Sequence, residues 1–290
     1  MTEANAGRSC VFCGNRPVTK EHVFRNAYRR LHTDEVTNYR HKNLMSGDAR
    51  NLRGKTPFEE TQVKRVCAQC NNGWMNDLEV ATEPTLWPMV HGKQTLVDAG
   101  SAQLLALWAV KTCMMRAFAD PHHAVQQSDL KHVFANRRPP DHWRVFLGRT
   151  SSNGLAENTW WSQSLLSETG TKPKLGAEPN LHLQQHNLMI GDVFLSTIGC
   201  ASTYGTSTAK VVVDLMTSEI QSTTTSQLLM LWPQPQQFTW PFEPPVPAAG
   251  FAMVGSAVER FARESPPLPG ASLGRPVGGF LSHFVFPAED

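Results

Sequence analysis

The chain has 290 residues, of which 40% are hydrophobic and 18% are charged, and its formal net charge is +2. This composition is typical of a soluble globular protein with a sizeable core, and the length suits two domains. No run of about eighteen apolar residues occurs, which excludes a transmembrane helix. The first ten residues lack the layout of a secretory signal, so we expect a cytoplasmic protein.

Positive charge is concentrated near the N-terminus. The first 74 residues contain 13 Lys and Arg against 7 Asp and Glu, whereas the remainder is mildly acidic. A basic region of this kind is typical of a face that binds an acidic partner such as nucleic acid, and equally of an ordinary solvated surface.

Residues 1–9 are expected to form a flexible tail, and the next segment carries two CxxC pairs, Cys10/Cys13 and Cys67/Cys70. In a reducing compartment such pairs are more often metal ligands than disulfides, and two pairs complete a tetrahedral four-cysteine zinc site. The long separation between the pairs favours a treble clef, in which a hairpin supplies one pair and a helix start the other. We therefore expect a domain over 10–92 that one structural zinc holds together.

Two elements are expected inside that domain. The polar, glycine-punctuated stretch 32–55 predicts a loop. A helix is expected over 72–81, with Asn71 or Asn72 as its N-cap and Pro84 soon after its end.

A second domain, of α+β class, is expected over 93–245. Apolar residues recur at helical spacing over 101–119, which predicts a core-facing helix capped by Ser101. Lys111 falls in the middle of the apolar face. We favour its extension to solvent over a meeting with a buried carboxylate.

A second helix is expected over 127–136, followed by a mainly antiparallel sheet. The isolated Cys113 and Cys200 are expected to be buried. The segment 246–290 is rich in proline and is expected to be largely irregular, with one short helix at 251–263. The strand-like runs of the sheet lie at 143–148, 158–166, 181–198, 210–216 and 228–232.

Polar side chains adjoin both cysteine pairs. The dipeptide Glu21-His22 follows the first pair, and Asn71 comes directly after the second. In a treble clef the two segments face each other, so these side chains would approach one catalytic ion while the zinc stays remote. An imidazole suits a general base near neutral pH, although a lone histidine is often a surface or core residue.

Several of these polar residues also have a simple structural explanation. Asn71 and Asn72 can be helix caps and nothing more. Asn76 and Glu79, one helical turn apart, can add ion ligands, but we favour a solvated face for both. The chain "HLQQH" from His182 to His186 lies in a strand-like region, where helical metal-ligand spacing does not apply.

The phrases "TKEHVF" (19–24) and "VCAQCNNGWMNDLE" (66–79) closely resemble HNH endonucleases of the His-Me finger, or ββα-metal, type with a four-cysteine zinc. The resemblance is to an actinobacterial and phage branch with EHVF and CNNGWM motifs. It extends more weakly to "ALWAVKT" and to the later "LWP" and "WPF" segments. The motif-bearing match covers about residues 10–90.

The resemblance implies specific roles. His22 would be the general base that activates water for attack on a phosphodiester, and Glu21 and Asn71 would ligate a divalent ion. The ion, Mg²⁺ or Mn²⁺, would stabilise charge on the phosphorane and on the leaving oxygen. The zinc at Cys10, Cys13, Cys67 and Cys70 would be structural.

The chain departs from the family pattern at two positions. Glu21 stands where the family usually has Asp. The family's middle Asn normally lies about five residues before the second pair, where this chain has Gln62, and Asn43 or Asn51 would substitute only if the polar loop folds back.

The expected partner is double-stranded DNA, bound through its phosphates by basic side chains around His22, and the protein can be a homodimer. The main alternative is a non-catalytic treble-clef zinc protein that binds nucleic acid or a protein partner. A structural zinc domain attached to an unrelated α+β enzyme is a weaker alternative. The candidate phosphate-binding residues are Arg25, Arg29, Arg30, Lys64 and Arg65.

Overall fold

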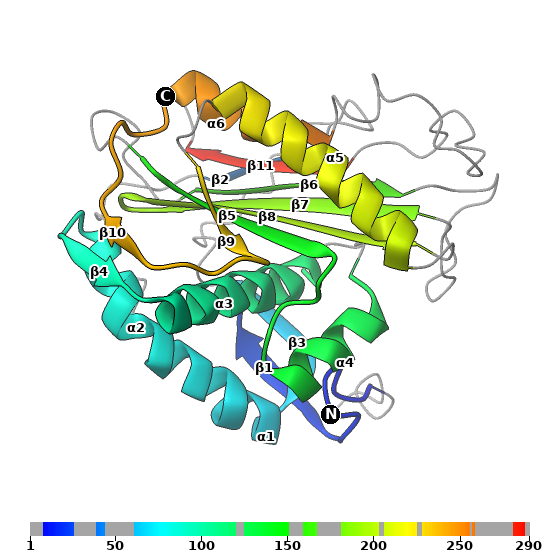
Figure 1. Ribbon diagram of the computed structural model, residues 1–290. Helices are drawn as coiled ribbons and strands as arrows, with labels where there is room; N and C mark the ends of the chain where they lie inside the picture. Colours follow the sequence, from blue (N-terminus) through cyan, green and yellow to red (C-terminus); the bar gives the residue numbers. More distant parts are fainter. Residues whose placement is uncertain are drawn as a thin grey trace.

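Helices and antiparallel sheets make up an α+β fold in the computed structural model of the protein (Figure 1), as the sequence predicts. The structure describes residues 8–25, 39–43, 61–119, 125–150, 159–166, 181–202, 206–224, 228–255, 257–258 and 281–287.

The largest element is a sheet of seven strands in which every neighbouring pair is antiparallel. Its longest pairing joins the two ten-residue strands β7 and β8 through a turn at Gly191, which has a φ of +51°. In spatial order the strands are β2 (Tyr39–Asn43), β11 (Leu281–Pro287), β6 (Thr159–Leu166), β7 (Leu181–Ile190), β8 (Val193–Ser202), β5 (Trp143–Arg149) and β9 (Leu229–Trp232).

Helices cover both faces of this sheet (Figure 1). On one face lie α5 (Thr206–Thr224) and α6 (Ala248–Gly255), and on the other lies α3 (Ala99–Ala117). Side chains of a strand alternate between faces, so Phe146 of β5 packs with the α5 cluster whereas Val145 and Leu147 join the α3 cluster.

A smaller assembly packs on the far side of α3. An antiparallel ribbon of β1 (Val18–His22) and β3 (Gln62–Cys67) leads into a helical run of α1 (Ala68–Cys70), the π-helical segment η4 (Asn71–Met75) and α2 (Asn76–Val90). Buried residues of the ribbon, α2 and α3 belong to one hydrophobic cluster. The remaining elements are α4 (Gln127–Asn136) and a short pair of β4 (Thr95–Val97) with β10 (Phe238–Trp240).

The strand predicted over 210–216 is wrong, because this segment lies inside α5. Its β-branched run favours a strand locally. However, Val212, Val213, Met216 and Ile220 recur at helical spacing and are fully buried against the sheet. Packing of that face outweighs the local preference.

The predicted start of the helix at residue 72 is also wrong. Cys67 is the N-cap of α1, without a side-chain hydrogen bond, and Asn71 has helical φ and ψ, so the helical run begins before Asn71. The run is kinked at Gly73, whose φ of −94° and ψ of −118° are not helical. The helix continues through Pro84 to Val90. Prolines there remove backbone hydrogen bonds, but the buried Leu86 and Met89 hold this part of the helix in the core.

Other boundaries differ in smaller ways. Asp98 rather than Ser101 caps α3, since its Oδ1 accepts a 2.7 Å hydrogen bond from the Ser101 amide. The expected loop at 32–55 contributes β2, and the proline-rich segment contributes β11. β2 lies at the sheet edge, where charged residues such as Arg40 and Lys42 are tolerated. The expected run 181–198 is two strands.

Several predictions are confirmed. Helix 127–136 has the predicted bounds. The strands predicted over 143–148, 158–166 and 228–232 are present, and their observed ends lie within two residues of the predicted ends. Cys113 and Cys200 are buried. The predicted flexible tail lies outside the described residues up to residue 7. None of the helices that the structure describes has the length and apolarity needed to cross a membrane.

Gly199→Ala should destabilise the sheet. Gly199 pairs with Trp143 across β8 and β5, and an added Cβ would lie 2.5 Å from the indole ring, which is buried and fixed by Asp129. We expect a loss of about 1–3 kcal/mol in the free energy of unfolding, measured in urea. Gly100→Ala is the control, because its Cβ would meet only the Asp98 carboxylate at 3.3 Å. Equal stability of the two variants would contradict this packing.

Candidate functional site

The ribbon and the helical run bring the two cysteine pairs together. Val18 pairs with Cys67, so the segment before β1 lies against the end of β3. The pair Cys10/Cys13 lies on a tight turn, which is closed by a hydrogen bond from the Gly14 amide to the Cys10 carbonyl. Gly14 has a φ of +80°, which glycine adopts readily. A second bond from the Val11 amide to the Arg65 carbonyl, 2.9 Å long, fixes this turn on β3.

Four sulfur atoms therefore converge, and all lie within 4.8 Å of one another. The Cys13 and Cys67 sulfurs are 3.5 Å apart, well beyond the roughly 2.05 Å of a disulfide. Tetrahedral Zn–S bonds of about 2.3 Å place sulfurs roughly 3.8 Å from one another. The cluster of Cys10, Cys13, Cys67 and Cys70 is thus positioned to hold one metal ion.

The thiols are already unequal in their affinity for a proton. Burial opposes ionisation of Cys10, but hydrogen bonds from the backbone of Cys13, Cys67 and Phe12 lower its pKa to about 7. Burial and the neighbouring thiols raise the pKa of Cys70. A cation that replaces the protons would relieve the repulsion among four thiolates, which couples metal binding to folding of this region.

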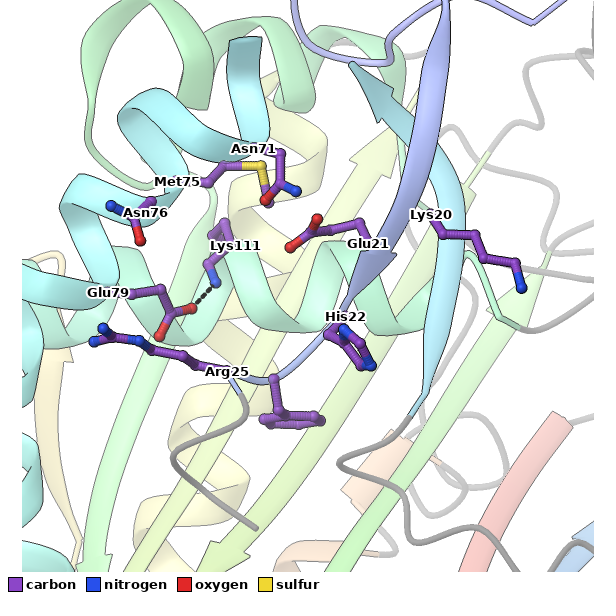
Figure 2. A pocket seen from close by; sticks show the side chains of 10 residues that line it. Lys20, Glu21, His22, Arg25, Asn71, Met75, Asn76, Glu79 and Lys111 are labelled. Carbon is purple, nitrogen blue, oxygen red and sulfur yellow. Dashed lines mark hydrogen bonds and ion pairs between the residues drawn. The ribbon is translucent and has the colours of Figure 1, made fainter. Parts of the chain in front are cut away.

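A pocket of about 250 Å³ lies beside the cysteine cluster (Figure 2). It brings together the three predicted catalytic residues, Glu21 and His22 from the end of β1 and Asn71 from the first turn after Cys70. Helix residues Met75, Asn76 and Glu79 and, from α3, Lys111 complete the lining, together with Lys20, Phe24 and Arg25.

Glu21 is the most perturbed acid of this pocket. Burial raises the pKa of its carboxyl to about 7, Lys111 acts in the opposite direction, Glu79 adds to the rise and a hydrogen bond with Asn71 opposes it. The Glu21–Asn71 hydrogen bond joins the strand to the helix. A carboxylate and an amide oxygen are ligands that Mg²⁺ and Mn²⁺ accept, so the two residues fit a divalent ion in chemistry.

His22 contacts the residue at the family's middle position. Its Nε2 lies 2.7 Å from the Gln62 amide Nε2, and the two residues are paired across the ribbon. The amide therefore fixes the orientation of the imidazole. Gln62 is therefore a functional candidate, although the sequence indicated it only as a departure from the family pattern.

Glu79 and Lys111 contradict two expectations. Lys111 does not extend to solvent. Its side chain is 2% exposed and its ammonium forms an ion pair with Glu79. Glu79 is likewise buried rather than on a solvated face, and its Oε2 accepts a 2.8 Å hydrogen bond from Trp108 Nε1. The signal was present in the sequence, since each charge falls among apolar positions of its helix. Asn76 is exposed, as expected.

Two of the candidate phosphate-binding residues, Arg25 and Arg65, have protein partners of their own. Arg25 forms an ion pair with Glu83. The Arg65 guanidinium lies 5.3 Å from the Phe118 ring centroid, and burial lowers its pKa. Lys64 is half-buried on β3. Arg29 and Arg30 lie outside the described residues.

No family model, curated protein or solved structure matches this chain. Its function is therefore inferred from the quoted motifs and from the geometry of the cysteine cluster and the adjoining pocket.

Replacing one cluster thiol should remove the metal. We expect the purified protein to retain about one zinc ion per chain after dialysis, and Cys67→Ser to lose it, because three thiols leave the tetrahedral site incomplete. Elemental analysis measures this. Cys200→Ser is the control, since Cys200 is a buried thiol outside the cluster. Full zinc content in Cys67→Ser, or equal loss in the control, would contradict the assignment.

Glu21 should make the zinc-loaded protein less stable as pH rises, in the absence of other divalent ions. The pKa of the folded-state carboxyl is about 7 against a usual value of 4.5, so the folded state binds the proton more tightly. The stabilisation is complete below the lower value and is lost as pH rises through the higher one. Urea unfolding at about pH 5 and about pH 8 should therefore favour Glu21→Gln over wild type only at the higher pH. A stability difference that does not change with pH would contradict the shift.

Proposed function

We propose that the protein is a metal-dependent HNH-type endonuclease that hydrolyses phosphodiester bonds in DNA. One observation carries this proposal. Glu21, His22 and Asn71, which the motifs assign to catalysis, line one pocket beside a four-cysteine cluster, although the strand and the helix that carry them are far apart in sequence.

In this proposal the cysteine cluster is a structural zinc site. The turn at Cys10–Gly14, the β1–β3 ribbon and the helical run after Cys67 correspond to the knuckle, hairpin and helix of a treble clef. All four positions are thiols, a complete ligand set with no position left open for substrate. The zinc therefore holds the site together and takes no part in the reaction.

His22 is the general base. Its imidazole is half-exposed at the pocket, so water can reach it, and Gln62 holds one ring nitrogen. Base catalysis requires the Gln62 amide oxygen to accept from Nε2–H, which leaves the Nδ1 lone pair free to take a proton from water. The Gln62 amide can turn either its oxygen or its nitrogen toward His22 without moving the rest of the side chain, because the two atoms are interchangeable in shape.

Glu21 and Asn71 hold the divalent ion. When bound, Mg²⁺ or Mn²⁺ supplies charge stabilisation for the phosphorane and the leaving oxygen. Glu21 is suited to this task because it shares the pocket with His22 and is half-buried, and Asn71 would turn its Oδ1 toward the ion. Since the proton and the ion compete for Glu21, ion binding strengthens as pH rises through about 7.

Cleavage of supercoiled plasmid DNA with Mg²⁺ or Mn²⁺ tests this function. Loss of the general base in His22→Ala should lower the rate by about 10²–10⁴-fold with zinc content unchanged. His91→Ala is the matched control, because His91 is an exposed histidine outside the pocket. Wild-type protein that binds DNA without cutting it would instead favour the non-catalytic zinc protein, and undiminished cleavage by His22→Ala would overturn the role of His22.

Gln62→Ala should lower kcat about tenfold or more with little change in KM, because a ring that is free to rotate spends less time in the productive orientation. Gln69→Ala is the control, since Gln69 is an exposed glutamine of the same region whose amide meets Asn15 rather than a pocket residue. An unchanged kcat in Gln62→Ala would mean that the Gln62–His22 contact has no catalytic role.

A further inference from the structure

A buried ammonium group forms the back of the candidate pocket. Lys111 extends from the middle of α3, is 2% exposed and lines the pocket with Glu21 and Asn71. Figure 2 shows it between the Glu79 and Glu21 carboxylates, with Lys20 directed away from them. Burial of a lysine is costly unless its charge is paired and its N–H groups find acceptors.

The partners of Lys111 account for only part of its hydrogen-bonding capacity. An ammonium group has three N–H donors. Among the described residues, the one hydrogen bond of Nζ goes to Glu79 Oε1. Two donors are therefore left to meet whatever occupies the pocket, and both water and an anionic oxygen would accept from them.

Glu79 takes only one of the three N–H donors of Lys111, because each of its two oxygens already accepts a hydrogen bond. Trp108 Nε1 donates to Oε2 at 2.8 Å, and Lys111 donates to Oε1. The Trp108 bond holds the carboxylate from α3, and the carboxylate in turn holds Nζ at the pocket wall. An ion pair that served only to join α2 to α3 would not require the lysine to border a polar pocket.

The charges of the pocket also favour an anionic ligand once a divalent ion is present. The carboxylates of Glu21 and Glu79 are opposed by the Lys111 ammonium, while Arg25 is paired with Glu83. One divalent ion makes the sum of Glu21, Glu79 and Lys111 positive by about one charge, which one phosphodiester neutralises.

We propose that Lys111 is the anion-binding residue of the pocket, donating its two remaining N–H groups to a non-bridging oxygen of the substrate phosphate. This inference rests on the proposed function for its substrate, the phosphodiester. It assigns to α3 a direct part in a site whose other polar residues come from the ribbon and the helical run. Charge-assisted hydrogen bonds of this kind are short and strong, and they orient the phosphate relative to Glu21 and His22.

Inorganic phosphate, added to the zinc-loaded full chain with saturating Mg²⁺, tests this role apart from cleavage. We expect phosphate binding, followed by ³¹P NMR line broadening, to weaken at least about tenfold in Lys111→Met. Because Lys111→Met leaves Glu79 buried without its counter-charge, Lys111→Met/Glu79→Gln is measured beside it. Lys93→Met is the control, since Lys93 is an exposed lysine outside the pocket.

Glu79→Gln separates anion binding from a purely structural role. Its single amide oxygen replaces the two carboxylate acceptors of Trp108 and Lys111, so this variant is the background against which the double variant is compared. Phosphate should bind more weakly to Lys111→Met/Glu79→Gln than to Glu79→Gln. Equal binding in Glu79→Gln and in the double variant, wild-type binding in Lys111→Met, or no binding by the wild type would overturn the proposal. Phosphate binding that depends on Lys111 in a protein that fails to cleave DNA would instead count against the nuclease function and leave the anion site standing.

Discussion

Convergence of four thiols is the constraint on which the rest of the site depends. The pairs Cys10/Cys13 and Cys67/Cys70 belong to segments separated by a long polar stretch, and their sulfurs lie within 4.8 Å of one another. A single ion bound there would fix the turn before β1 to the start of the helical run. Glu21 and His22 follow Cys13 on β1, and Asn71 directly follows Cys70. The geometry of the pocket therefore depends on the cysteine cluster, in which an ion bound by four thiols would have no open position for substrate.

A second interaction links this region to the helix that lines the large sheet. Glu79 of α2 accepts from Trp108 and pairs with Lys111, both on α3, in a setting almost without solvent. Buried ion pairs contribute little net stability, and their value lies in fixing one arrangement of groups. Here the arrangement sets two carboxylates and an ammonium around one pocket. It also bears on the pKa of Glu21, which burial raises, which Lys111 lowers and to whose rise Glu79 adds.

How much of the fold and of the site could be predicted from the sequence depends on whether each signal lies in neighbouring residues or in contacts between distant segments. The cysteine spacing, the Glu21-His22 dipeptide and Asn71 could be located because their chemistry is written in short motifs. The bounds of α4 were predicted correctly because the helix ends directly before the sequence RRPP at 137–140. By contrast, α5 was predicted as a strand because its β-branched residues are a local signal, whereas the sheet that buries Val212 and Met216 is not. β2 pairs with β11, and β11 pairs also with β6. Both were missed because β2 lies in a polar stretch and β11 in a proline-rich one, where composition indicates irregular structure. Lys111 was assigned to solvent because its partner Glu79 lies on another helix.

The central claim is that a second, oxygen-ligated ion site lies beside the cysteine cluster. Anomalous diffraction from crystals of the zinc-containing protein soaked in Mn²⁺ tests it most directly, because the two metals are distinguished by their absorption edges. We expect a zinc peak among the four sulfurs and a separate manganese peak in the pocket, bonded to Glu21 and Asn71 with His22 nearby. A zinc peak alone, or manganese bound away from Glu21, would contradict it.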